Sequence, residues 1–144
     1  MYNDFILERL QTLQNAGMVT NADAVGQVGN LSLGTVIKIY LRITNGVITE
    51  AKFKPFGGVF ALVASDIVCD FLINSSIETA LTIKNEDIVS AMDGLPEDKL
   101  HIADLVQSAV VDAVYDYYKK LSKAKLNKKK WSAMLDYSVI QKAK

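Results

Sequence analysis

Cysteine is almost absent from the sequence, because Cys69 is the only one among 144 residues. A chain with one cysteine cannot form an internal disulfide. Long apolar runs are also absent, and the lack of any stretch of about 18 or more apolar residues argues against a membrane span. The N-terminal residues are polar and acidic, which does not fit a secretory signal peptide. We therefore expect an intracellular protein, with the cytoplasm as the default location.

Catalytic motifs are missing as well. The sequence contains no glycine-rich phosphate loop, no paired acid–base motif and no cysteine–histidine pair suited to nucleophilic catalysis. Only two residues are proline and 50% are apolar, so the chain can bury a sizeable core as one domain. We expect a globular domain that is not an enzyme.

Charge is distributed unevenly although the net charge is zero. Residues 1–118 hold seven basic and fifteen acidic side chains, whereas residues 119–144 hold nine lysines and one aspartate, which gives net charges of −8 and +8. Such a tail can bind nucleic acid, a membrane surface or an acidic partner, or it can dock on its own acidic body. Docking is favoured, because apolar residues of the tail recur at helical spacing: Trp131, Met134 and Leu135. We expect an amphipathic extension over residues 121–144 that binds neither membranes nor nucleic acid.

Strand patterns occupy one block of the sequence. Residues 24–30 are expected to form a first strand, and the alternation from Ile37 to Ile43 predicts a half-buried second strand. Asn45-Gly46 predicts a tight hairpin, because a type I′ turn needs positive φ at both positions. Residues 47–54 form the expected return strand, whose inner face would carry Val47, Ala51 and Phe53.

Helical patterns cover the rest of the chain: residues 5–13, 59–73, 75–82, a helix from 85, and 101–121. The first is expected to end near Gly17, Ser75 and Glu78 have capping-box spacing, and Asn85 suits an N-cap. The last is expected to face the core with Leu105, Ala109, Asp112 or Ala113, and Asp116 or Tyr117. Strands followed by helices imply an α+β fold, with helices packed on a small three-stranded antiparallel sheet.

Several segments, taken in order, carry a family resemblance: residues 21–30, 53–58, 83–88, 94–96 and 99–101. Over residues 1–120 the chain resembles the IscU/NifU family of iron–sulfur cluster assembly scaffolds. The resemblance implies a scaffold domain on which a cluster is built by three cysteines, an aspartate and a histidine. The extension over residues 121–144 lies beyond it.

The ligand positions implied by the resemblance have changed. The cysteine positions fall on Leu33, Gly58 and Ile102, and the aspartate position falls on Thr35. Only the histidine is kept, as His101. Iron in a cluster is normally held by four thiolates, with histidine or carboxylate as occasional substitutes. We therefore expect no cofactor, and a member of the family that has lost its cluster ligands.

Replacement ligands are scarce. Cys69 lies 11 residues beyond Gly58 on an expected helix, about 16 Å along its axis, and is better interpreted as a core residue. His101 remains a weak metal-site candidate that would need carboxylates such as Asp104 or Asp66, or ligands from a partner.

Partner contacts are the remaining expectation. Leu33, Gly58, Val59, Phe60 and Ile102 would form an apolar cluster, either filling the former site or offering a surface for a partner. The resemblance also implies a chaperone-recognition loop, which here has the sequence Leu95-Pro96-Glu97-Asp98-Lys99. Leu95, Pro96 and Lys99 keep its ends, but two acids replace a proline and an aliphatic residue, which weakens apolar recognition.

The expected function is protein–protein interaction in or near the cluster assembly pathway. The resemblance suggests a cysteine desulfurase, another scaffold protein or a second copy of the chain as partner. Two alternatives stay open. One is residual iron or cluster binding through His101 with partner-supplied ligands, and the other is an unrelated binding role of the basic tail.

Overall fold

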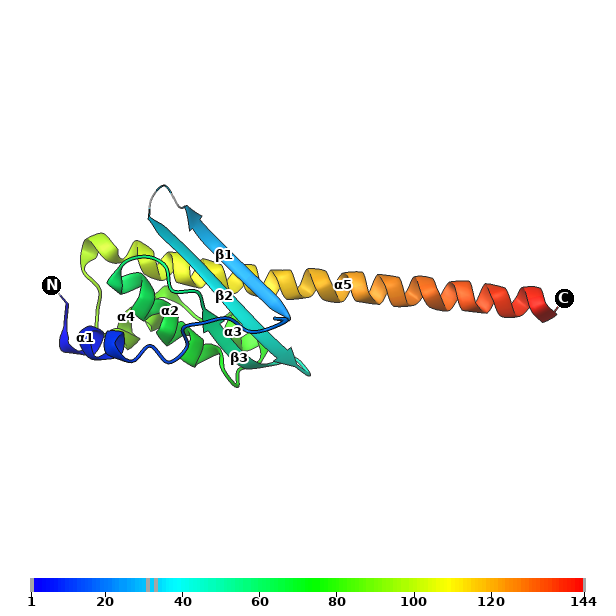
Figure 1. Cartoon of the computed structure of the whole chain (residues 1–144), viewed down its shortest axis with the longest axis horizontal. Coiled ribbons are helices and arrows are strands. Elements are labelled where there is room, and N and C mark those ends of the chain that lie inside the picture. The colour runs from blue at the N-terminus through cyan, green and yellow to red at the C-terminus, as the bar shows by residue number, and fades with distance from the viewer. Residues whose placement is uncertain (1, 31, 33, 144) are drawn as a thin grey trace.

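The computed structural model describes residues 2–30, 32 and 34–143, although the side chains of residues 30 and 126–143 lie outside that description. Three antiparallel strands form one sheet in the order β1-β2-β3, and helices pack against it (Figure 1). The predicted α+β class is therefore confirmed. The elements in chain order are α1 (Asp4–Gln11), β1 (Ala24–Asn30), β2 (Thr35–Thr44), β3 (Val47–Phe53), α2 (Val59–Leu72), α3 (Ile77–Ala80), α4 (Asn85–Ala91), the 3₁₀ helix η2 (Glu97–Lys99) and α5 (His101–Ala143).

The central strand β2 supplies the middle of the core. Its alternate residues are at most 8% exposed and belong to one buried cluster with residues of the helices: Ile37, Ile39, Leu41 and Ile43. The turn that follows has φ values of 52° at Asn45 and 78° at Gly46, as a type I′ turn requires. The hairpin between β2 and β3 is thus confirmed.

A β-bulge changes which residues of β3 face the core. Ala51 pairs with Leu41, but Ile43 pairs with Ile48, so the register shifts between Arg42 and Ile43. The extra residue reverses the alternation beyond it. Ile48 is fully buried whereas Val47 is 37% exposed, and the prediction that Val47 faces inward was wrong.

Helices α2 and α5 cover the inner face of the sheet. Ten of the fourteen residues of α2 are buried, as its nearly uniform apolar sequence predicted. The stripe predicted for α5 holds for Ala109 and Ala113, which are buried, and for Leu105 and Tyr117, which are partly buried against the core, whereas the alternative Asp112 is exposed. The prediction missed several members of the fully buried face, which consists of Ile102, Ala103, Val106, Ala109, Val110, Ala113 and Val114.

The other helices begin or end away from their predicted positions. α1 stops at Thr12 rather than near Gly17, because the segment after it bonds to β3: Phe53 N–H donates to the Asn15 carbonyl, and Gly17 N–H donates to the Phe53 carbonyl. The N-cap of α3 is Ser76 instead of Ser75. Asn85 is the first residue of α4 rather than its N-cap.

A charged network that is buried at Asp66 and reaches solvent at Asp70 joins α1 to α2. Arg9 donates from Nε to Asp66 at 2.5 Å and from Nη2 to Asp70. Asp66 is fully buried, and its second oxygen accepts from the Asn15 backbone N–H at 2.8 Å. Burial opposes the charge of Arg9, but the hydrogen bonds to Asp70 and Asp66 outweigh it and raise the pKa of Arg9. Arg9, Asn15, Asp66 and Asp70 therefore stabilise the packing of α1 and the segment after it on α2.

Helix α5 also closes the free edge of the sheet. The backbone N–H of Val25 donates to Asp116, and that of Gln27 donates to Asp112, each at 2.9 Å. Residues two apart on a strand and residues four apart on a helix are separated by similar distances. The carboxylates of Asp112 and Asp116 therefore match the spacing of the N–H groups of Gln27 and Val25. Exposed strand edges invite pairing with other chains, and these contacts cover the edge of β1.

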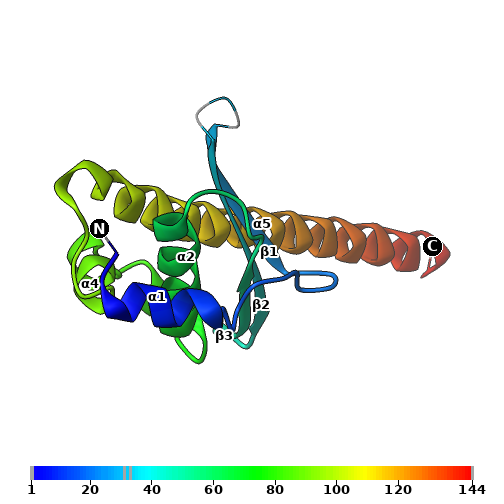
Figure 2. The same ribbon diagram turned by 60° about the vertical axis from the view of Figure 1, so that its left-hand side comes forward.

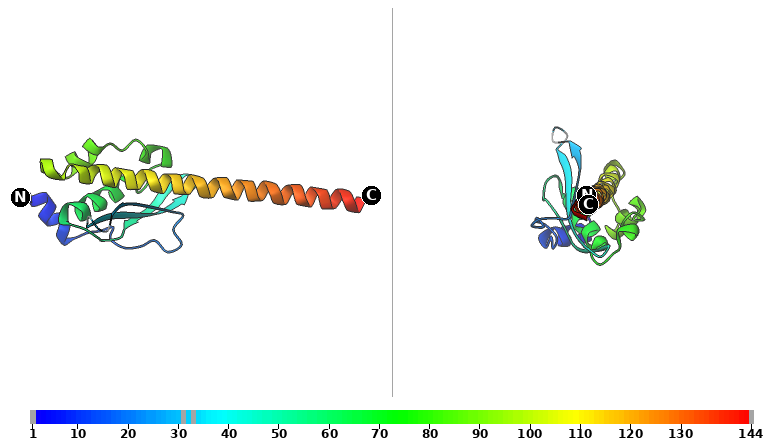
Figure 3. Two further views of the ribbon diagram at one scale, coloured as in Figure 1. Left: turned by 90° about the horizontal axis from the view of Figure 1, so that it is seen from above. Right: turned by 90° about the vertical axis from the view of Figure 1, so that its right-hand side faces the viewer.

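The second half of α5 extends past the rest of the chain (Figure 3). The helix spans 43 residues, or about 65 Å at 1.5 Å per residue. The expected additional C-terminal helix is therefore present as an unbroken continuation of α5, and it does not fold back onto the acidic body. The apolar side chains predicted to favour docking, Trp131, Met134 and Leu135, lie outside the described side chains. Across the described part of the chain, no helix combines the length and apolarity needed to cross a membrane.

Candidate functional site

The implied ligand positions lie at the starts of three elements. Thr35 begins β2, Gly58 is the N-cap of α2, and His101 and Ile102 begin α5. Leu33 lies outside the described residues. The ends of β1 and β2 that flank this region extend beyond the helices (Figure 2).

Two of these starts lie close together. A Cβ atom placed on Gly57 would lie 3.8 Å from the carbonyl oxygen of Gly34, so the connection from β3 to α2 passes near the residue before β2. α2 and α5 pack on each other, and Phe60 and Ile102 share one buried cluster. The fold thus gathers these positions at one end of the helices.

The side chains at these positions cannot form a metal centre. Gly58 is exposed with open space where a Cβ would lie, and Ile102 is only 7% exposed. Thr35 is partly buried, and His101 is exposed. Glycine and isoleucine offer no lone pair from the side chain, so His101 has no neighbour at these positions with the chemistry of an iron ligand.

Within the described part of the chain, no cluster of other side chains stands in for the implied ligands. Among the described residues, no group of three or more histidine, cysteine, aspartate or glutamate side chains is placed to hold a metal ion. Asp66 is bound to Arg9, and Asp104 accepts from the side chain of Asn85. The structure does not bring Asp66 and His101 into one site.

Cys69 is part of the core, as predicted. It is fully buried in α2. Burial, reinforced by the charges of Asp66 and Asp70, raises the pKa of the Cys69 thiol well above its usual range. The thiolate is the form that binds metals, so this residue is unsuited to ligation.

The residues predicted to bind a partner are only partly brought together. Phe60, Leu95 and Pro96 line a hollow of about 280 Å³ together with Asn3, Ile6, Asp93 and Gly94. Phe60 is 4% exposed, and the ring of Tyr2 lies 5.1 Å from it. Val59 and Lys99 do not line the hollow. In the described part of the predicted apolar cluster, Phe60 and Ile102 are buried, Val59 is partly buried and Gly58 is exposed.

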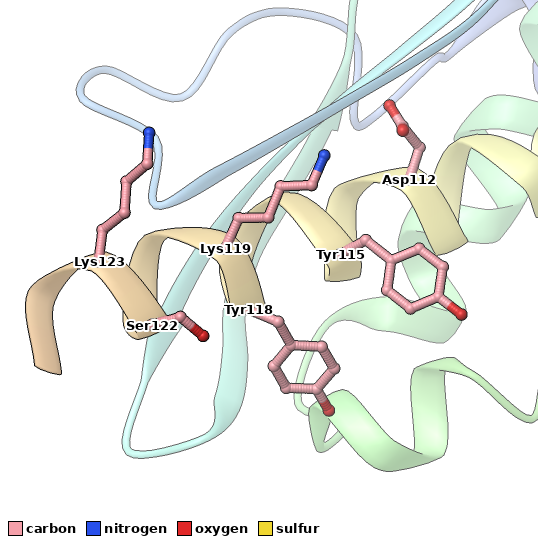
Figure 4. Close-up of a pocket in the computed structure, with 6 residues that line it drawn as sticks. All are labelled: Asp112, Tyr115, Tyr118, Lys119, Ser122 and Lys123. Carbon is pink, nitrogen blue, oxygen red and sulfur yellow. The ribbon is translucent and has the colours of Figure 1, made fainter. Parts of the chain in front are cut away.

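A larger hollow lies along α5, with a volume of about 470 Å³. Figure 4 shows the residues that line it: Asp112, Tyr115, Tyr118, Lys119, Ser122 and Lys123. All come from one helix, and the two tyrosine rings point to one side of it while the two lysines point to the other. These side chains do not converge on one point, so the hollow has no built binding site.

A third hollow, of about 250 Å³, lies on the outer face of the sheet. It is lined by Gln27, Val36, Lys38, Lys54 and Phe56. No sequence pattern predicted this hollow, although the alternation of β2 places Lys38 on the opposite face from the buried isoleucines. Its position depends on Phe56, which follows the last strand.

Comparisons with known proteins agree with this architecture. Residues 1–124 match the family model described as "NifU-like N terminal domain". The chain is 33% identical over 123 residues to the iron-sulfur cluster assembly scaffold protein IscU 1 of Archaeoglobus fulgidus, covering 85% of this chain and 80% of that protein. It is 30% identical over 123 residues to the iron-sulfur cluster assembly scaffold protein IscU of Escherichia coli, covering 83% and 95%.

A solved structure supports the fold. A nitrogen-fixing NifU-like protein (N-terminal) from Brucella abortus superposes with a TM-score of 0.63 at 19% sequence identity. The match covers 82% of this chain and 94% of that one.

Proposed function

Since the chain belongs to the NifU-like N-terminal domain family, we propose that it is a scaffold-like protein that acts by protein–protein contact in or near iron–sulfur cluster assembly. In this proposal it does not hold a cluster with its own side chains, and it works in the cytoplasm without catalysing a reaction. Its partners would be a cysteine desulfurase, an active scaffold protein or a second copy of itself.

One observation carries the proposal: the ligand positions are changed while the fold around them is intact. Of the five positions, only His101 keeps a side chain that suits iron. The sheet, the hairpin, the charged network between α1 and α2 and the core are all present. Contact with other proteins requires a folded surface and does not require side-chain ligands for a cluster, so an intact fold with changed ligand positions supports a role in contact.

Binding to proteins of the assembly pathway tests the proposal. The purified chain would be passed over an immobilised cysteine desulfurase and an immobilised scaffold protein from its own source, and its self-association would be followed by analytical ultracentrifugation. Saturable binding to one of these proteins is expected. Absence of binding to both, together with a monomer at all concentrations, would contradict the proposal.

Residue changes at the same end of the molecule locate that contact. His101→Ala removes the kept site residue from an exposed position and should leave binding unchanged if His101 serves no metal. Leu95→Asp places a charge in the hollow beside Phe60 and should weaken a contact made there. Gly94 has a φ of 97° and is left unaltered, because a side chain there would strain the loop.

A further inference from the structure

The outer face of the sheet carries an unusual concentration of positive charge. Opposed residues on neighbouring strands share a face, so Gln27, Lys38 and Lys54 form one row across the sheet. The next row contains Tyr40 and Lys52. Three of the seven basic residues among residues 1–118 therefore lie in two adjacent rows, although this part of the chain carries a net charge of −8.

These three lysines have no acidic partner. Within the described residues, none of Lys38, Lys52 and Lys54 forms an ion pair, whereas Arg42 in the third row is paired with Glu50 at 2.6 Å. Lys38 lies instead over the ring of Tyr40, 5.4 Å from its centroid. The positive charges of these three lysines are therefore available to an anionic group outside the chain.

The arrangement also contains an apolar recess. The hollow of about 250 Å³ lies between Lys38 and Lys54, and its other lining residues are Gln27, Val36 and Phe56. Phe56 is 41% exposed, which is high for a large apolar side chain beside a groove. Aromatic residues at the centre of a patch with a charged surround are typical of protein contact sites.

Another segment limits the size of the open surface. Residues between α1 and β1 reach the third row, where the Thr20 carbonyl accepts from Arg42, and Val19 and Tyr40 are both buried. The open part is therefore the end that holds Gln27, Lys38, Lys54 and Phe56, next to Thr35 and the connection to Gly58. It adjoins the former ligand positions.

We propose that this end of the outer sheet face docks an acidic polypeptide segment of a partner protein, with one apolar side chain of that segment seated between Lys38 and Lys54. The recess accommodates one side chain, while Lys52 extends the positive surface beyond it, so an extended acidic segment fits better than a small anion. The inference rests on the proposed function: the proposed function requires a protein partner, and the inference names the chemistry of that partner.

Backbone amide NMR spectra of the full chain test the proposal without knowledge of the partner. The probe is a short glutamate-rich peptide that carries one phenylalanine, and its matched control replaces every glutamate with glutamine. We expect shifts concentrated at residues 27, 36–38, 52–54 and 56 with the acidic peptide, weakened by salt, and none with the control. Shifts elsewhere, or equal shifts with both peptides, would overturn the proposal.

Charge reversal supplies the matched variants. Lys38→Glu with Lys54→Glu should weaken binding of the acidic peptide by about tenfold or more, because like charges across an interface repel. Lys84→Glu with Lys125→Glu changes the net charge equally at exposed positions outside the groove and should leave binding within about twofold. Equal losses in the two double variants would show a general charge effect and overturn the proposal.

Two further experiments distinguish an acidic peptide from other ligands of this face. Phe56→Ala should weaken binding of the peptide with phenylalanine but not of one with alanine in its place. Sodium phosphate and a single-stranded oligonucleotide are titrated in the same way. If either produced the same shifts at a lower concentration than the peptide, the face would bind small anions or nucleic acid, and the proposal would be overturned. Because these titrations need no assembly protein, their failure is distinguishable from failure of the pathway-binding experiment.

Discussion

At the residue scale, two of the ligand positions that the family resemblance implies, Gly58 and Ile102, are ordinary parts of the fold. Ile102 is buried in the core with Phe60, and burial of a large aliphatic side chain contributes about 1.5–3 kcal/mol. Gly58 is the N-cap of α2 with an extended backbone, at φ −76° and ψ 174°. Ile102 and Gly58 thus serve packing and chain geometry.

The thiol of Cys69 should be unreactive in the folded chain. Burial and the nearby carboxylates of Asp66 and Asp70 raise its pKa, so it stays protonated and shielded from solvent. We expect no reaction with an aromatic disulfide reagent under native conditions and one thiol per chain in denaturant. Rapid reaction of the native protein would show that Cys69 is accessible and a potential ligand.

The chemistry of the implied ligand positions follows from the sequence alone, but the packing around them does not. The residue types at positions 58 and 102 already exclude side-chain ligation, whatever the fold. Whether Phe60 and Ile102 are buried could not be predicted, because it depends on how α2 packs on α5 and on Tyr2 covering Phe60. The groove beside Lys38 was missed because Phe56 lies after the strand, where no periodic pattern places it.

At the element scale, the closest packing joins β1 to α5. Gly26 lets the two backbones approach, because a Cβ there would lie 2.1 Å from the carbonyl oxygen of Ala109 and 2.5 Å from the nitrogen of Ala113. The small residues Ala109 and Ala113 are fully buried on the helix side. Asp112 and Asp116 then satisfy the N–H groups of the strand edge on either side of this contact.

Gly26→Ala should therefore destabilise the fold. The added methyl group meets backbone atoms that cannot move independently, and overpacking of this kind costs about 1–3 kcal/mol or more. Urea denaturation measures the free energy of unfolding. Gly58→Ala is the matched control, since its Cβ meets open space and its φ is negative, and it should change stability by less than about 0.5 kcal/mol. Equal effects of the two changes would contradict the packing of β1 on α5.

The edge contact of Asp116 should make part of the stability depend on pH. Burial opposes its charge, but the hydrogen bond from Val25 N–H and the proximity of Lys120 outweigh this and lower the pKa of Asp116 below its ordinary value of 3.8. A carboxyl group with a lowered pKa stabilises the fold fully above its unfolded-state pKa, and this contribution is lost as pH falls through the folded-state pKa.

Asp116→Asn should accordingly cost about 0.5–1 kcal/mol near neutral pH, since the side chain of Asp116 is 31% exposed and its ion pair is screened. The cost should shrink as pH falls below about 4. Urea denaturation across this range measures both. Asp98→Asn, at an exposed position in η2, is the control and should show no such trend. A pH-independent cost at Asp116 would contradict the assignment.

The elements with strong local signals were predicted correctly, and those shaped by tertiary contacts were not. Asn45-Gly46 specifies its turn by backbone conformation alone. By contrast, the bulge that buries Ile48 and exposes Val47 has no signature in the alternation of residues 47–54. The early end of α1 follows from pairing of Asn15 and Gly17 with Phe53, which lies far away in the sequence.

At the scale of the whole molecule, negative and positive charge lie at opposite ends of α5. The acidic body carries −8 and the part from residue 119 onward carries +8, while the helix leads away from the body (Figure 1). The family match ends at residue 124, close to where the helix leaves the core. Among the described side chains, Tyr118 is the last on α5 that packs against the core.

A chain that ends at Lys125 should keep the stability of the full chain. The described core of α5 is complete in it, so the free energy of unfolding should change by less than about 0.5 kcal/mol. Urea denaturation of both chains at equal ionic strength measures the difference. A loss of several kcal/mol would show that residues beyond 125 pack on the body, as the charge pattern first suggested.

In the proposed function, this fold does not hold a cluster with its own side chains. Anaerobic reconstitution with ferrous iron and sulfide, followed by desalting, measures whether it does. We expect a colourless protein without visible absorbance and without retained iron, because His101 is the one iron-binding side chain among the implied ligand positions that the structure describes. A brown protein that keeps stoichiometric iron and sulfide after desalting would contradict the proposed function.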